Sequence, residues 1–314
     1  MTSTRLALTF PGQGAQRPGM GLPWTHTPGW SVVAEVSEAA GRDIETLLLD
    51  ADTATLRRTD NAQLTTFTLA LVAMTELRRQ HPLATFPGAC AGHSLGEYSA
   101  LVAAGILDPQ DAVRLIMARG DAMRAACERT EGAMAAVLGL DTDRVQELVD
   151  EIHATGGQVW LANLNSPQQT VVAGRTADVE RCSRAAQRAG AVKVVALTVD
   201  GAFHTPLMAG AVEPFTAALA TARFMPGHSA VVANVDARAY RGGPHWAELL
   251  RRQLTAPVRW SDTLHTLTAE LACDRLMEIG PGRTLTGLAK ATVPRVPRDT
   301  FSDPTKSLAA APAV

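Results

Sequence analysis

A serine in a glycine-rich turn is the residue whose surroundings point most directly to chemistry. Gly92-His93-Ser94-Leu95-Gly96 matches the pattern G-x-S-x-G, in which a sharp turn between a strand and a helix exposes a nucleophilic serine. The glycines suit such a turn because it leaves no room for side chains beside the nucleophile. The same residues also fit a glycine-rich turn in which Ser94 merely caps a helix.

A serine nucleophile needs a base, because its hydroxyl reacts poorly at its ordinary pKa. Of the eight histidines, His204 is the best candidate, since it follows a run that reads as a strand ending at Val199. Active-site residues of open α/β sheets gather at the carboxyl ends of strands. His93 is less suited as the base because it is adjacent to Ser94. The alternative for His204 is an exposed loop histidine.

Two further features could stabilise negative charge. The turn Pro11-Gly12-Gln13-Gly14 could present the backbone N–H of Gln13 to an oxyanion, with the N–H of Leu95 as the second donor. A phosphate loop is the alternative, although the turn lacks the glycine-lysine pattern of such loops. Arg119 lies towards the end of a largely apolar helix at 111–118. It could bind a substrate carboxylate or form a structural salt bridge.

The elements that would position these residues indicate an α/β protein. Residues 6–10 and 86–92 read as strands, residues 62–80 as a helix, and a helix follows Ser94 through Leu101. Between 131 and 199 the pattern is strand (132–140), helix (143–154), strands (158–164 and 169–174), helix (177–188) and strand (192–199). Asp141, Thr142 and Thr176 are the cap candidates of the two helices. The tail from about Arg295 is aperiodic and is expected to be loosely ordered.

The order β-α-β-β-α-β is that of a ferredoxin-like unit. We therefore expect a large α/β domain made of residues 1–130 and 199–314, interrupted by a ferredoxin-like subdomain at 131–198.

Composition excludes several classes of protein. The 314 residues are 46% hydrophobic and 19% charged, which is enough material for a core. The net charge of −2 argues against nucleic acid or an anionic membrane as the main partner. The cysteines Cys90, Cys127, Cys182 and Cys273 are far apart and suggest neither a zinc site nor a disulfide framework. No stretch has the roughly 18 apolar residues of a membrane span, so a cytoplasmic location is expected.

Several segments together resemble the malonyl-CoA:acyl-carrier-protein transacylase family, which includes the acyltransferases of polyketide synthases. The resemblance runs from Phe10 to about Lys290. The matching segments are FPGQGAQ (10–16), GHSLGEYSA (92–100), ARGDAM (118–123), GAMAAVLG (132–139), ANLNSPQQTVVAG (162–174), GAFHTPLM (201–208), QLTAPVRW (253–260) and EIGPGRTLTGLAK (278–290). It implies an α/β-hydrolase-like domain with a parallel sheet and an inserted ferredoxin-like subdomain.

The resemblance also implies roles for single residues. Ser94 would be the acylated nucleophile and His204 its base, with the backbone carbonyl of Gln253 orienting the histidine in place of an acidic triad member. The N–H groups of Gln13 and Leu95 would form the oxyanion hole. The substrate-binding residues would be Arg119, which pairs with the malonyl carboxylate, and Met123, Met134, His93 and Phe203.

The segment GAFH at 201–204 bears on acyl selectivity. Phe203 fits malonyl, because its ring would fill the space that an α-methyl group needs. Gly201 departs from the usual histidine of the malonyl-specific polyketide enzymes, and GAFH resembles stand-alone acyltransferases that act in trans on polyketide assembly lines.

The expected reaction is therefore a ping-pong transfer of malonyl from CoA to the phosphopantetheine thiol of an acyl carrier protein. It would need no metal and no redox cofactor, and the chain is expected to be a monomer. A basic patch for the carrier protein could come from Arg251, Arg252, Arg259, Arg283 and Lys290. The alternatives are an acyl hydrolase that clears stalled carrier proteins, an enzyme that moves acyl chains between carrier proteins, and a docking module with a dead site. The sequence leaves fatty acid and polyketide synthesis both open.

Overall fold

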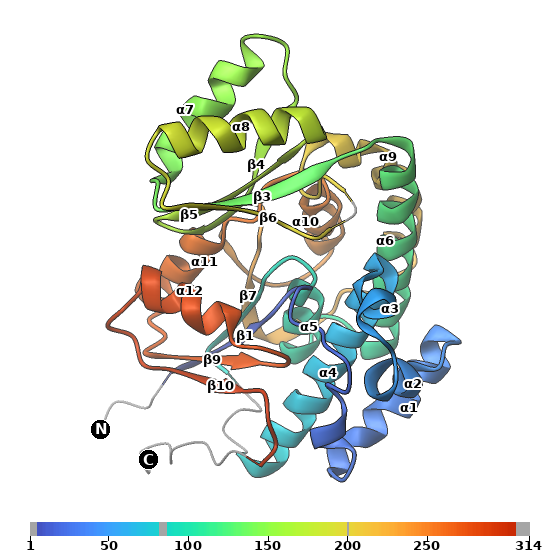
Figure 1. Cartoon of the computed structure of the whole chain (residues 1–314). Coiled ribbons are helices and arrows are strands. Elements are labelled where there is room, and N and C mark those ends of the chain that lie inside the picture. The colour runs from blue at the N-terminus through green and yellow to red at the C-terminus, as the bar shows by residue number, and fades with distance from the viewer. Residues whose placement is uncertain (1–4, 82–86, 200, 306–314) are drawn as a thin grey trace.

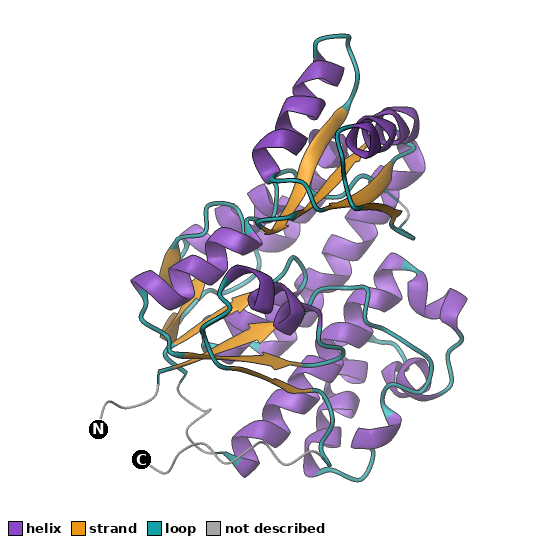
Figure 2. Cartoon of the chain, turned by 60° about the vertical axis from the view of Figure 1, so that its left-hand side comes forward, coloured by secondary structure: helices purple, strands orange, loops and turns teal. Residues whose placement is uncertain are grey.

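The computed structural model describes residues 5–81, 87–199 and 201–305 and contains two separate β-sheets (Figures 1 and 2). The larger sheet has six strands in the order β10-β9-β1-β2-β7-β8. Its strands are β1 (Leu6–Phe10), β2 (Ala89–Gly92), β7 (Pro226–Val232), β8 (Ala239–Gly242), β9 (Arg275–Ile279) and β10 (Arg298–Phe301). Every neighbouring pair is parallel except β7 and β8. The predicted α/β class is confirmed.

Parallel pairing brings the carboxyl ends of three neighbouring strands to one edge of the large sheet. In register, Phe10 of β1 lies beside Gly92 of β2, and Ala91 lies beside Val232 of β7. The segments that follow these strands, at 11–14, 93–95 and 233–234, therefore start from the same edge. A site assembled from strand-to-helix turns is typical of this edge of an open α/β sheet.

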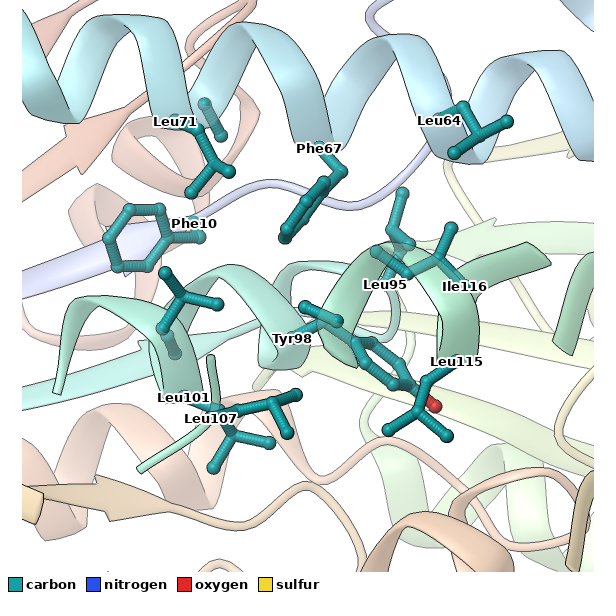
Figure 3. Packing of buried hydrophobic residues seen from close by; sticks show 14 of the residues in the cluster. Phe10, Leu64, Phe67, Leu71, Leu95, Tyr98, Leu101, Leu107, Leu115 and Ile116 are labelled. Carbon is teal, nitrogen blue, oxygen red and sulfur yellow. The ribbon is translucent and has the colours of Figure 1, made fainter. Parts of the chain in front are cut away.

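Helices of the first part of the chain build the core beside this sheet. They are α1 (Ser31–Ala40), α2 (Ile44–Leu49), α3 (Thr53–Arg57), α4 (Thr59–Gln80), α5 (Gly96–Ala103) and α6 (Pro109–Arg129). Figure 3 shows Leu64, Phe67 and Leu71 of α4 above Tyr98 and Leu101 of α5, with the side chain of Phe10 beside them. Both helices are buried along most of their length, which fixes the direction of α5 and of the turn that precedes it.

The rest of the large part of the chain is built from later segments. These are the 3-10 helix Pro206–Met208 and the helices α9 (Ala209–Leu219), α10 (His245–Gln253), α11 (Trp260–His265) and α12 (Thr284–Thr292). In Figure 1, α6 and α9 run side by side at one margin of the molecule, and α12 lies near the strands β9 and β10 with α11 beside it.

The smaller sheet is antiparallel and carries two helices on one face. Its strands β3 (Ala133–Leu138), β4 (Val159–Ser166), β5 (Gln169–Gly174) and β6 (Lys193–Ala196) pair in the order β4-β5-β3-β6. The helices α7 (Thr142–His153) and α8 (Thr176–Arg188) cover the face turned away from the large sheet (Figure 2). The order of elements agrees with the predicted β-α-β-β-α-β pattern, while the domain boundaries at 131 and 198 stay a prediction.

Several local expectations were wrong. Asp141 occupies the predicted N-cap position of α7 but its side chain makes no capping hydrogen bond, and Thr176 is the first residue of α8 rather than its cap. Helix α6 runs to Arg129, so Arg119 lies near its middle rather than its end. The tail is not loose throughout, because β10 adds an edge strand to the large sheet and buries Phe301. Strand β6 ends at Ala196, and the first residue of the strand predicted at 86–92 lies outside the described residues.

No helix in the described part of the chain is long and apolar enough to cross a membrane.

Candidate active site

The turn between β2 and α5 holds Ser94 in a backbone conformation that few residues adopt. Its φ is +51°, in the left-handed region, which a non-glycine residue occupies at an energetic cost when the surroundings enforce it. The flanking glycines have a steric reason. A Cβ at Gly92 would lie 1.9 Å from the carbonyl of Gly96, and a Cβ at Gly96 would lie 2.1 Å from the carbonyl oxygen of Phe10. The elbow is therefore pressed against the end of β1.

His204 meets Ser94 from a distant part of the chain. Ser94 Oγ lies 2.8 Å from His204 Nε2, and His204 Nδ1 lies 2.8 Å from the backbone oxygen of Gln253. Because a carbonyl oxygen can only accept, Nδ1 carries the proton and the lone pair of Nε2 faces the serine hydroxyl. His204 also has a positive φ, of 63°.

The surroundings of His204 keep its imidazole neutral. Only 5% of the residue is exposed. Burial, and after it the charge of Arg119, lower the pKa of His204 to about 3, while the hydrogen bond to the backbone of Gln253 acts in the opposite direction. A neutral imidazole can accept a proton from Ser94.

The predicted reason for the position of His204 was wrong. The strand that precedes it, β6, belongs to the small antiparallel sheet and not to the parallel one. The segment after β6 returns to the large part of the chain, and this return places His204 over the elbow.

Arg119 brings a buried cation to the same serine. It is 1% exposed. One terminal nitrogen donates to Gln63 Oε1 at 2.7 Å, and the other donates to Ser94 Oγ at 3.1 Å and to Gln253 Oε1 at 3.0 Å. Within the described residues its Nε has no hydrogen-bond partner, and the guanidinium forms no ion pair with a carboxylate. The site thus holds a desolvated positive charge beside a nucleophile.

The glycine-rich turn after β1 lies against the elbow. A Cβ at Gly12 would lie 2.7 Å from the backbone oxygen of His93. The N–H groups of Gln13 and Leu95 donate no hydrogen bond to any described residue. The two predicted oxyanion donors therefore lie in turns that contact each other. Neither N–H has a hydrogen-bond partner among the described residues.

His93 joins the elbow to the small sheet. Its Nε2 lies 2.9 Å from Asn165 Oδ1 on β4, and its ring lies 5.5 Å from that of Trp260. Burial lowers the pKa of His93. A second link runs from the segment after α10, because Val258 N–H donates to Ala162 O and Leu164 N–H donates to Val258 O.

The other predicted pocket residues lie in the core around this site. Phe203, Met123 and Met134 are each at most 4% exposed. The sulfur of Met123 lies 4.0 Å from Gln63 Nε2, which connects it to a partner of Arg119. Phe203 directly precedes His204 in a tightly packed turn, because a Cβ at Gly201 would lie 2.2 Å from the sulfur of Cys127.

Four polar residues of the site were missed by sequence reasoning. Gln63 binds Arg119. Asn234, which follows β7, accepts from the N–H of Ser94 at 2.7 Å and donates to Gly92 O at 2.7 Å. Glu97 accepts from Asn234 and Gln253, and Asn165 binds His93. The one signal available was the presence of Gln63 and Glu97 inside runs that otherwise read as buried helices.

Two of the five basic residues proposed for a carrier-protein patch already have acidic partners. Arg251 pairs with Glu248 at 2.6 Å, and Arg259 pairs with Asp262 at 2.9 Å. A cavity of about 610 Å³ lies between the start of α4 and the second half of α6, and its walls include Arg58, Arg124 and Cys127. Ser94 and His204 do not line it. No cluster of His, Cys, Asp or Glu among the described residues could hold a metal ion.

The acyl transferase domain family matches residues 8–312. The malonyl CoA-acyl carrier protein transacylase of Escherichia coli O157:H7 is 37% identical over 309 residues, covering 98% of this chain and 99% of that protein. The protein of the same name from Bacillus subtilis strain 168 is 36% identical over 303 residues, covering 96% of this chain and 94% of that protein.

Solved structures of malonyl transacylases also match this chain over nearly its whole length. The malonyl-CoA:acyl carrier protein transacylase of Xanthomonas oryzae pv. oryzae superposes with a TM-score of 0.90 at 37% identity, covering 97% of this chain and 96% of that chain. A type II polyketide synthase acyl-carrier protein has been solved in complex with its malonyl-transacylase. The match to that structure has a TM-score of 0.90 at 35% identity and covers 96% of both chains.

Proposed function

The chain belongs to the malonyl-CoA:acyl carrier protein transacylase family, and we propose that it moves a malonyl group from CoA to the phosphopantetheine thiol of an acyl carrier protein through an acyl-enzyme at Ser94. One observation carries the assignment of the site. Ser94 Oγ lies within hydrogen-bonding distance of both a neutral histidine nitrogen and the buried guanidinium of Arg119. The nucleophilic oxygen of Ser94 therefore lies next to both a base and a cation that can bind a carboxylated acyl group.

The first half-reaction acylates Ser94. Its hydroxyl transfers the proton to Nε2 of His204 while Oγ attacks the thioester carbonyl. The N–H groups of Gln13 and Leu95 stabilise the oxyanion, and each such donor is worth on the order of 3 kcal/mol in the transition state. The tetrahedral intermediate collapses, the C–S bond breaks, and the CoA sulfur leaves with the proton from His204.

The second half-reaction reverses these steps with a different thiol. His204 takes the proton of the phosphopantetheine thiol, the sulfur attacks the malonyl-serine ester, and Ser94 Oγ recovers a proton as it leaves. The carbonyl of Gln253 stabilises the imidazolium that forms in each half, because it accepts from Nδ1. Among the described residues no acidic side chain hydrogen-bonds to His204, and this supports the proposed role of the Gln253 carbonyl.

Arg119 gives the site its preference for a carboxylated acyl group. A charge that is desolvated and lacks an ion pair has most to gain from a substrate carboxylate. The bound carboxylate also offsets the positive charge that lowers the pKa of His204, so the substrate strengthens the base that activates the nucleophile. Phe203, Met123, Met134 and His93 complete the proposed acyl pocket, with Phe203 limiting substitution at the α-carbon.

Transfer to a carrier protein and hydrolysis are the two outcomes that must be distinguished. The enzyme should be mixed with malonyl-CoA, and free CoA release should be followed with and without phosphopantetheinylated carrier protein. A transacylase releases about one CoA per enzyme without the acceptor and turns over continuously with it. Continuous release of malonate without the acceptor would identify a hydrolase, and no transfer with several carrier proteins would contradict the proposal.

A cytoplasmic location also belongs to the proposal. Its support is the family itself, whose relatives with high coverage include several bacterial enzymes, although one relative from Drosophila melanogaster is named as mitochondrial. Cell fractionation with detection of the chain tests the location. The acceptor comes from fatty acid or polyketide synthesis, and transfer rates to carrier proteins of both kinds would identify which.

A further inference from the structure

Glu97 is a buried ionisable residue that the two half-reactions do not use. It lies in the first turn of α5, three residues after Ser94, and is 1% exposed. Burying a carboxylate is costly unless it is paired or well hydrogen-bonded. A residue of this kind directly behind a nucleophile therefore needs a physical explanation.

Both oxygens of Glu97 face hydrogen-bond donors. Oε1 accepts from the backbone N–H of Asn234 at 2.7 Å, and Oε2 accepts from Nε2 of Gln253 at 2.5 Å. A carboxylate can accept at both positions, whereas an amide would turn an NH₂ group towards one of the two donors. The arrangement is thus specific for an acceptor-only side chain.

The two partners of Glu97 are the residues that hold the reacting groups. Gln253 accepts from Nδ1 of His204 through its backbone oxygen and donates through Nε2 to the backbone oxygen of Ser94. Asn234 accepts from the N–H of Ser94 and donates to the carbonyl of Gly92. Glu97 therefore holds Gln253 and Asn234 in place, and these two residues position the nucleophile Ser94 and its base His204.

The amide of Gln253 also separates Glu97 from Arg119. Its Nε2 donates to Glu97 while its Oε1 accepts from the guanidinium at 3.0 Å. Burial raises the pKa of Glu97, whereas its two hydrogen-bond donors and the charge of Arg119 lower it. Because both oxygens accept hydrogen bonds, the geometry favours the ionised carboxylate. A carboxylate in direct contact with Arg119 would occupy the guanidinium N–H groups that the substrate needs. Glu97, which is separated from Arg119 by the amide of Gln253, compensates the positive charge and leaves those N–H groups available.

We infer that Glu97 is a positioning residue that orients Gln253 and Asn234 for catalysis and compensates the charge of Arg119 while leaving it available to the malonyl carboxylate. The inference rests on the proposed function, and wild-type acylation by malonyl-CoA must be established first. If the wild type is not acylated, the proposed function itself fails. If the wild type is acylated, the Glu97 variants test the inference alone.

The first test is Glu97→Gln, with Glu278→Gln as a matched control. Glu278 is also 1% exposed, and its oxygens accept from the N–H groups of Leu285 and Thr286. Among the described residues it forms no hydrogen bond with Ser94, His204 or Gln253. Both variants should lower Tm, but only Glu97→Gln should lower kcat for malonyl transfer, by about tenfold or more in folded protein. Wild-type kcat in folded Glu97→Gln, or equal losses of kcat in both variants, would overturn the inference.

A double exchange, Glu97→Gln with Gln253→Glu, tests whether the amide must lie between the carboxylate and Arg119. It also provides a test if Glu97→Gln alone does not fold. It keeps one carboxylate and one amide, but the carboxylate now contacts Arg119 directly. The amide introduced at position 97 can accept from Asn234 and donate to the new carboxylate, so stability should exceed that of Glu97→Gln. KM for malonyl-CoA should nevertheless rise by about tenfold or more, because Arg119 is occupied. A wild-type KM in the double exchange would refute the claim that the amide keeps Arg119 available.

Discussion

Replacement of Arg119 by alanine tests how the site recognises its substrate. The guanidinium lies near the middle of α6, is 1% exposed, and makes one of its hydrogen bonds to Ser94 Oγ. Removing it leaves a malonyl carboxylate in a desolvated site with no positive partner. Acetyl-CoA has the same thioester and no carboxylate, so it reports on the chemistry of Ser94 without this interaction.

The size of the effect follows from the burial of Arg119. Breaking a buried charge pair by removing one partner costs about 3–5 kcal/mol, and each 1.4 kcal/mol is about a factor of ten. Acylation by malonyl-CoA should therefore fall by two to three orders of magnitude in Arg119→Ala. Acylation by acetyl-CoA should stay level or rise, because the wild type leaves Arg119 without a carboxylate when acetyl is bound.

The variant will also be less stable, and the assay must allow for that. The Oε1 atoms of Gln63 and Gln253 lose their donor from Arg119, and a buried unsatisfied acceptor costs about 1–3 kcal/mol. Circular dichroism should confirm that the variant is folded at the assay temperature.

The measurement is single-turnover labelling of Ser94 by each thioester, followed by intact mass. Arg124→Ala is the control, because Arg124 is on the same helix, is 48% exposed, and pairs with Glu128. It should change neither rate. If malonyl and acetyl labelling fall equally in folded Arg119→Ala, then Arg119 is structural and the reasoning for a carboxylated substrate fails.

Three other predictions follow from the site and its supports. Phe203→Ser should shift the ratio of kcat/KM towards methylmalonyl-CoA by about tenfold or more, because a methyl group in a pocket is worth roughly 1–3 kcal/mol; an unchanged ratio would show that Phe203 does not limit the α-carbon. The pKa of His204 falls from an ordinary value of 6.5 to about 3 on folding, so the unfolded chain binds the extra proton between these values and the stability contributed by neutral His204 decreases as pH falls below about 6.5. Urea midpoints should therefore fall more steeply between about pH 6.5 and 4 in the wild type than in His204→Ala, and parallel curves would contradict the shift. Gly96→Ala should unfold the elbow or abolish labelling, because the new Cβ would lie 2.1 Å from the carbonyl of Phe10, whereas Gly287→Ala on α12 meets nothing within 4 Å and should raise stability by up to about 1 kcal/mol; calorimetry of both variants decides, and a tolerated Gly96→Ala would refute the steric argument.

Local patterns predicted much of this architecture because they report local physics. The strand Leu6–Phe10 and the hairpin strand Gln169–Gly174 match the structure residue for residue, since short apolar runs bounded by turn residues determine them. The elbow at Ser94 was predictable for the same reason. A Cβ at Gly92 or at Gly96 would collide with neighbouring backbone, and the spacing of these two glycines reports that contact.

The parts that sequence reasoning missed depend on contacts between distant residues. Asn234 reaches Ser94 from a segment 140 positions away, and Asn165 reaches His93 from 72 positions away. No local pattern marks such a partner. The strand Arg298–Phe301 has no alternation of its own and forms because β9 offers an unpaired edge. The length of α6 was underestimated because polar residues and Gly120 interrupt its apolar run after residue 118, although Ala122, Met123 and Ala126 continue the buried face.

The most direct test of the account is whether malonyl-CoA acylates Ser94 and whether a carrier protein then removes the acyl group. Wild-type protein should gain the mass of one malonyl group within a single turnover, and peptide mapping should place it on Ser94. Phosphopantetheinylated carrier protein should return the enzyme to its original mass and gain the group itself, whereas Ser94→Ala should gain none. Persistent labelling of folded Ser94→Ala, or an unlabelled wild type, would contradict the central claim.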